Sequence, residues 1–151
     1  MPIAITIHIL AAVIWVGGMF FAYMVLRPAA LDLGPPQRLS LWSRAFARFF
    51  PWVWVAVVLL LRSGYWMILF AFDGFANVGL YIHIMQATGI LMMLIFLHVY
   101  FAPYRRLQRA LAEADFEAAG KALNQIRILI AINLALGLIT IVVGTAGAYY
   151  T

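Results

Sequence analysis

The sequence contains no cysteine among its 151 residues, and it has few charged residues of either sign. The absence of cysteine excludes disulfides, thiolate metal sites and cysteine nucleophiles. Only 10% of the residues are charged, whereas 67% are hydrophobic. A soluble domain averages roughly 25% charged residues, so this chain has too little polar surface to cover a water-soluble globule. We therefore expect much of its apolar surface to face lipid.

Acidic residues are also scarce, with five Asp and Glu against ten Lys and Arg. The chain shows no paired carboxylates, no serine triad and no phosphate-binding loop, which argues against hydrolytic catalysis. The basic residues stand at the ends of apolar runs, a pattern typical of membrane topology, so we predict no nucleic-acid partner. The first apolar stretch lacks the features of a cleaved signal peptide and is expected to stay in the mature protein.

Long apolar segments dominate what is present, and each is about the ~20 residues that a spanning helix needs. Pro51 is expected in the first turn of the second segment, Asp73-Gly74 at its end, and Pro103 at the end of the third. The predicted fold is all-α, an integral membrane four-helix up-and-down bundle in a single transmembrane domain, 1–151. The predicted spans are residues 3–26, 51–72, 78–102 and 128–150.

The loops predict the orientation of the bundle. Lys and Arg are concentrated in loops 27–50 and 103–127, whereas the loop between the second and third spans has only Asp73 as a charged residue. Cytoplasmic loops carry the excess of basic residues, so we predict that both basic loops are cytoplasmic and both termini periplasmic. The expected location is the bacterial inner (plasma) membrane, as a multi-pass protein. Residues 37–50 are expected to form an interfacial helix, and Asp115 is expected to cap a helix that enters the fourth span.

Histidines are the main candidates for chemistry, because ionisable groups inside a membrane are costly and commonly functional. His8 and His83 lie at similar depth near the outer ends of the first and third spans. Two such imidazoles can clamp a haem iron or contribute to a copper site. Gly17 and Gly18 could line a flat slot for haem. The alternative is that each histidine only forms a hydrogen bond across helices or faces the water interface.

Three further residues are candidates for supporting roles. His98 lies ~22 Å deeper than His83 along the third span, and with Met24 it could ligate a second, inner metal or haem. Arg62, inside the second span, could be a counter-charge for a bound anion such as a haem propionate, or a buried arginine satisfied by neighbouring groups.

The segment from His8 through Trp15, Gly18 and Phe20, together with Tyr81-Ile82-His83, resembles the CopD-like (copper resistance D) membrane proteins. More distantly, it is similar to the HemJ-type protoporphyrinogen oxidases. The first resemblance implies copper uptake or resistance, and the second implies haem b. HemJ-type proteins are expected to have a lysine at the position of Met85 and an arginine near Met24, so the resemblance does not carry the oxidase activity to this chain.

These observations lead to three functional hypotheses. The first is a haem-b-binding redox or electron-transfer protein with His8 and His83 as axial ligands, which leaves open whether the protein is an oxidoreductase. The alternative is a CopD-type copper-handling protein that uses the same histidines and some methionines. The third is a cofactor-free membrane subunit of a larger complex. The expected surroundings are the lipid bilayer, with a homodimer or a membrane redox partner left open.

Overall fold

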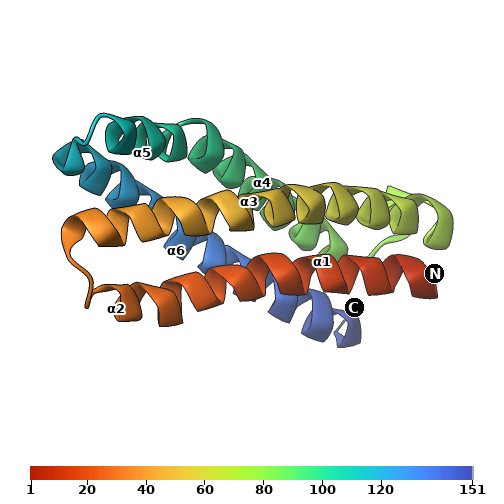
Figure 1. The fold of residues 1–151 in the computed structure, drawn as a ribbon. Helices are drawn as coiled ribbons and strands as arrows, with labels where there is room; N and C mark the ends of the chain where they lie inside the picture. Colours follow the sequence, from red (N-terminus) through yellow and green to blue (C-terminus); the bar gives the residue numbers. More distant parts are fainter. Residues whose placement is uncertain (151) are drawn as a thin grey trace.

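A computed structural model describes residues 1–150. All regular elements in that range are helical, and four helical segments are long and apolar enough to cross a membrane. The all-α fold with four spanning helices is therefore confirmed. In Figure 1 the two termini lie at one end of an elongated bundle, and the turns after α2 and after α5 lie at the other. The four segments are Pro2–Ala30, Pro35–Ala71, Leu80–Ala112 and Phe116–Tyr149.

The first span is one helical rod made of three pieces. It comprises α1 (Pro2–Phe20), the π-helical η1 (Phe21–Leu26) and α2 (Arg27–Ala30). Pro28 follows the π-helical turn, and a proline cannot donate the backbone hydrogen bond that an α-helix requires. The Arg27 N–H bonds the Ala22 carbonyl, five residues back, which widens the helix just before this proline.

The second span is longer than the sequence predicts. Helix α3 (Pro35–Trp66) confirms that residues 37–50 are helical. It joins the span without a break and continues into the π-helical η2 (Met67–Ala71). The prediction that Pro51 lies in a first turn is wrong, because Pro51 is inside α3. The reason is a continuous stripe of buried side chains on α3. Packing of this stripe stabilises one uninterrupted helix, although Pro51 cannot donate a backbone hydrogen bond. The stripe comprises Leu39, Trp42, Phe46, Phe50, Val53 and Val57.

The rest of the chain forms a short loop after the second span, then the third and fourth spans, which a short turn joins. The 3-10 helix η3 (Phe75–Asn77) precedes α4 (Leu80–Phe101), and α5 (Pro103–Ala112) follows after a break at Ala102. Asp73 and Gly74 both have positive φ and end the second span as predicted. Helix α6 (Phe116–Ala146) ends in the 3-10 helix η4 (Gly147–Tyr149). Asp115 is its N-cap and accepts a hydrogen bond from the Ala118 N–H at 3.1 Å, which confirms the predicted cap.

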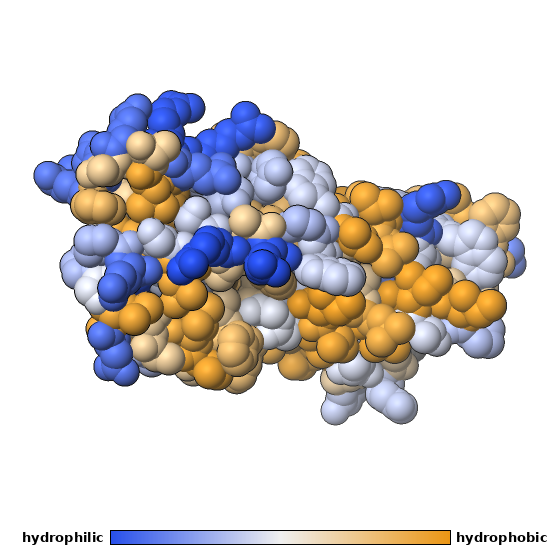
Figure 2. All heavy atoms as spheres, in the orientation of Figure 1, coloured by the Kyte–Doolittle hydropathy of each residue, from blue (hydrophilic) through white to orange (hydrophobic). Residues whose placement is uncertain are grey.

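An aromatic cluster ties the second span to the third. Phe50 packs edge-on against Phe96 of α4 and Tyr104 of α5. Trp15 of α1 also packs edge-on against Phe96. Large apolar side chains cover much of the remaining surface of the spans, as lipid-facing helices require. Figure 2 shows hydrophilic residues gathered over the end that carries α5 and the start of α6, while hydrophobic residues prevail towards the termini.

Candidate functional site

His8 lies half-buried on the face of α1 that packs against α3, near the end of the bundle that carries the termini. Its Nδ1 is 2.9 Å from the hydroxyl oxygen of Ser63, a residue of α3 that is only 7% exposed. Gly64 leaves space for the imidazole, since a Cβ there would lie 3.3 Å from the His8 Cε1. The ring is therefore held between two helices by close packing and by polar contacts with Ser63 and with the backbone of Leu60.

The hydrogen bonds of Ser63 favour one tautomer of His8. A hydroxyl has a single proton to donate, and the Leu59 carbonyl lies 2.6 Å from the Ser63 oxygen as an acceptor for it. With the Ser63 proton on that carbonyl, the Ser63 oxygen accepts from His8, and Nδ1 carries the proton of the neutral ring. The lone pair is then on Nε2. Metal-binding histidines in proteins are usually arranged this way, with the other ring nitrogen donating to a fixed acceptor.

Further polar contacts connect the helices at this end of the bundle. Gln86 of α4 donates to the Tyr65 hydroxyl of α3 at 2.9 Å. Thr140 of α6 and Thr88 of α4 are joined hydroxyl to hydroxyl at 2.7 Å. Together with the His8 contact, these hydrogen bonds link all four spans in the half that carries the termini. In lipid, such bonds hold helices together because water cannot compete for the groups.

The structure does not join the other predicted ligands to His8. His83 is exposed on α4, and among residues 1–150 no hydrogen bond connects it to His8. His98 is exposed near the far end of α4, and Met24 is 53% exposed on η1. Residues 1–150 contain no group of three or more His, Cys, Asp or Glu side chains that could hold a metal. A bis-histidine haem site and a second, inner site therefore stay predictions.

Arg62 is adjacent to Ser63 in sequence, but its side chain is exposed. Asn133, a buried residue that could have satisfied a central arginine, instead donates to the Met92 carbonyl of α4 at 3.1 Å. A role for Arg62 as counter-charge to a bound anion stays a prediction. Its exposure means that it faces lipid, headgroups or a partner rather than the bundle interior.

The two glycines expected to line a haem slot face different surroundings. Gly17 is exposed, with nothing within 4 Å of the place where a Cβ would stand. Gly18 packs directly beneath the ring of Phe49, which a Cβ would strike. Gly18 thus allows α1 and α3 to approach, and the space above it is filled by an aromatic side chain.

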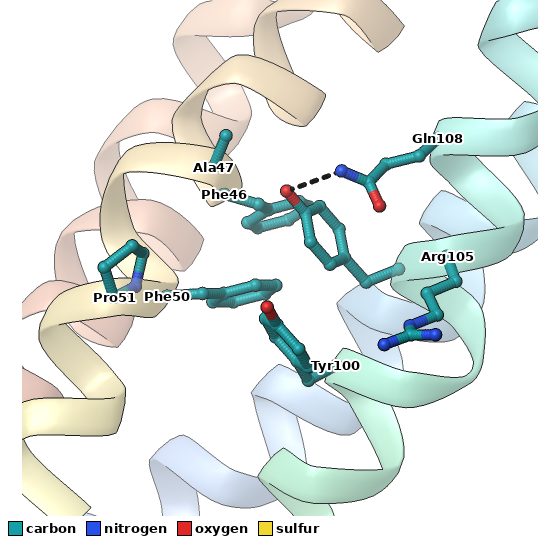
Figure 3. Close-up of a pocket in the computed structure, with 8 residues that line it drawn as sticks. Phe46, Ala47, Phe50, Pro51, Tyr100, Arg105 and Gln108 are labelled. Carbon is teal, nitrogen blue, oxygen red and sulfur yellow. Dashed lines mark hydrogen bonds between the residues drawn. The ribbon is translucent and has the colours of Figure 1, made fainter.

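Two features of the structure are not apparent from the sequence. One is Ser63, because a serine in an apolar helix commonly bonds its own backbone, and its second partner lies 55 residues away. The other is a cavity of about 390 Å³ between α3 and the α4–α5 junction. Figure 3 shows Phe46, Phe50 and Tyr100 around this cavity, with Gln108 donating to the Tyr104 hydroxyl at 3.1 Å.

Comparison with known proteins gives one family. The family model for copper resistance protein D (CopD) matches residues 43–147, which is most of the chain and includes α4, α5 and α6. His8 lies outside the matched range, whereas Ser63 lies within it. No curated protein and no solved structure shows a significant match.

Proposed function

Since this chain belongs to the copper resistance protein D family, we propose that it is a copper-handling membrane protein in which His8 is a metal ligand. The family match and the four apolar helices support a multi-pass membrane protein of a copper-related family. The assignment of His8 is our own inference from geometry. A location in the bacterial inner membrane, with the His8 end facing outward, is part of the same proposal and is based on the basic loops.

One observation carries the proposal: the hydrogen bond from His8 Nδ1 to Ser63 fixes the ring and leaves Nε2 with its lone pair. Imidazole nitrogen is a good ligand for copper in both oxidation states. An outer hydrogen bond of this kind raises the basicity of the ligand and restricts its rotation. The contact with Ser63 thus supports His8 as a metal ligand, because it restrains the ring and, with Nδ1 as the donor, leaves Nε2 to bind a metal.

The remaining ligands are proposed to come from side chains at the same end of the bundle. His83 is the first candidate, because it lies in the first turn of α4 and is accessible. Met85 is a poorer one, because its side chain packs against Gly144 of α6. A site with few protein ligands suits a protein that binds and then releases copper, because a copper ion held by a complete set of protein ligands dissociates slowly.

A copper titration tests this proposal. The purified protein in mild detergent is titrated with Cu(I) in competition with a chromogenic chelator, alongside His8→Ala, Ser63→Ala and the control His98→Ala. We expect His8→Ala to abolish competition, Ser63→Ala to weaken it about 10- to 100-fold as a lost second-sphere contact does, and His98→Ala to leave it unchanged. Equal affinity of His8→Ala and the wild type would overturn the proposal.

The same sample tests the haem hypothesis independently. A visible spectrum of the protein expressed with ample haem, recorded oxidised and then reduced with dithionite, would show a Soret band if haem is bound. We expect no such band for the copper-handling function. A haem spectrum lost in both His8→Ala and His83→Ala would replace copper handling by the bis-histidine redox function.

A further inference from the structure

A second cavity, of about 620 Å³, lies at the end of the bundle that carries the basic loops. Its walls come from η1 and α2 at the end of the first span, from the start of α3 and from the start of α6. The cavity therefore lies where three of the four spans emerge from the apolar region. Cationic side chains from all three line it, namely Arg27, Arg38, Lys121 and Arg127.

The three arginines have only neutral partners among residues 1–150. Arg27 Nε donates to the Tyr23 carbonyl at 3.3 Å, and its guanidinium lies 4.4 Å from the centre of the Tyr23 ring. Arg38 donates to the Leu33 carbonyl at 3.3 Å. None of these contacts neutralises the positive charge, and each leaves several N–H groups of the guanidinium to donate elsewhere.

Arg127 and Lys121 complete the charged wall on α6. Arg127 donates through Nε and Nη2 to the Asn124 side-chain oxygen, at 3.2 and 2.7 Å, which orients the guanidinium without neutralising it. Lys121 is 3.8 Å from Glu117, and both side chains are largely exposed, so this pair is weak. With one carboxylate against four cations, the cavity keeps a positive charge.

The rest of the wall is apolar. Leu39, Trp42 and Phe46 of the buried stripe on α3 form one side, and Leu123 and Ile130 of α6 also contribute. A cavity that is cationic on one side and apolar on the other matches a molecule with an anionic head and an apolar tail. Arginine forks are well suited to phosphate, since they donate two parallel hydrogen bonds to its oxygens.

We propose that this cavity binds the phosphate headgroup of an anionic membrane phospholipid, with the arginines on the phosphate and an acyl chain along the Trp42 side. Basic pockets between spanning helices at the headgroup level are suited to such lipids. A lipid held there would contact the first, second and fourth spans at once and would stabilise their packing. This inference does not depend on copper binding, because the cavity and His8 lie towards opposite ends of the bundle.

Native mass spectrometry of the detergent-solubilised protein tests the proposal. The probes are phosphatidylglycerol and phosphatidylcholine with identical acyl chains, so that only the net charge of the headgroup differs. We expect the wild type to retain one phosphatidylglycerol per chain and to bind phosphatidylcholine much more weakly. Equal retention of the two lipids by the wild type would overturn the proposal without any variant.

Variants then locate the site. Arg38→Gln combined with Arg127→Gln is expected to weaken phosphatidylglycerol binding on the order of tenfold or more, because it removes two of the cationic groups that line the cavity. The matched control is Arg44→Gln combined with Arg48→Gln, since both are exposed arginines of α3 that do not line the cavity. Equal weakening in the control would show that the lipid responds to overall charge and not to this cavity.

Inorganic phosphate distinguishes the source of the phosphate group. Thermal unfolding in detergent is measured with added phosphatidylglycerol and, separately, with millimolar phosphate at constant ionic strength. We expect the lipid to raise the melting temperature and phosphate to leave it unchanged. An equal rise with phosphate alone would assign the cavity to a soluble phosphate compound and overturn the lipid assignment.

Discussion

Asn133 is a buried polar residue in the middle of α6. Its amide nitrogen donates to the Met92 carbonyl of α4, and its side-chain oxygen has no hydrogen-bond partner among residues 1–150. Interhelical hydrogen bonds in membranes average about 0.6 kcal/mol, whereas an unsatisfied buried polar atom costs about 1–3 kcal/mol. The unpartnered oxygen is therefore expected to cost more than the hydrogen bond contributes.

We expect Asn133→Leu, which keeps the number and branching of the side-chain heavy atoms, to stabilise the bundle by about 0.4–2.4 kcal/mol, the difference between these terms. The measurement is thermal unfolding in detergent followed by circular dichroism. A melting temperature several degrees below that of the wild type would contradict this account, and would show that the Asn133 oxygen has a partner such as a bound water.

His8 and Ser63 show what the sequence reveals at the scale of single residues. His8 could be singled out because an ionisable side chain stands out within an apolar segment. Its partner could not be identified, since the helical period does not show which face of the second span meets the first. The exposure of His83 and Arg62 was likewise not predictable, because nearly uniform apolar helices have no polar side that indicates their rotation.

At the scale of elements, glycines on α6 determine how closely the neighbouring helices approach. A Cβ on Gly137 would lie 2.9 Å from Val16 Cγ2 of α1 and 3.1 Å from Met92 Cε of α4. Valine is stiff at χ1, so it cannot turn aside easily. Small residues serve this purpose in membrane helices generally, because packing replaces the hydrophobic effect as the force between them.

Gly137→Ala is therefore expected to destabilise the bundle by about 1–3 kcal/mol, as overpacking does. The matched control is Gly17→Ala, which places a methyl group in open space and should be neutral or stabilise the helix by up to about 1 kcal/mol. Both are measured by unfolding in detergent. Equal melting temperatures for the two variants would contradict the close contact between α1 and α6.

The element boundaries show where sequence patterns succeed. Three boundary features act through local backbone chemistry, so the sequence predicts them. They are Pro103 after the end of α4, the positive-φ pair Asp73-Gly74 and the Asp115 cap. Pro51 was misplaced for the opposite reason: its local preference for a first turn is overridden by the tertiary packing of the stripe from Leu39 to Val57. That packing involves partners on α4 and α5, which the local sequence does not show.

At the scale of the whole molecule, the structure places the termini at one end and the turns after α2 and α5 at the other. The basic residues on the helices that flank these turns predict which end is cytoplasmic. The absence of cysteine makes a direct test simple. In intact cells, Ala76→Cys should react with a membrane-impermeant maleimide, and Glu113→Cys should react only after permeabilisation. The opposite pattern would invert the predicted topology and place His8 near the cytoplasm.

The most direct test of the copper-handling function is X-ray absorption at the copper edge on the Cu(I)-loaded protein, compared with loaded His8→Ala. If His8 binds the metal through Nε2, the wild-type spectrum shows the outer-shell scattering of an imidazole ring, and this feature decreases or disappears in the variant. A wild-type spectrum with sulfur ligands alone, or an imidazole feature that is unchanged in His8→Ala, would contradict the assignment of His8 as the copper ligand.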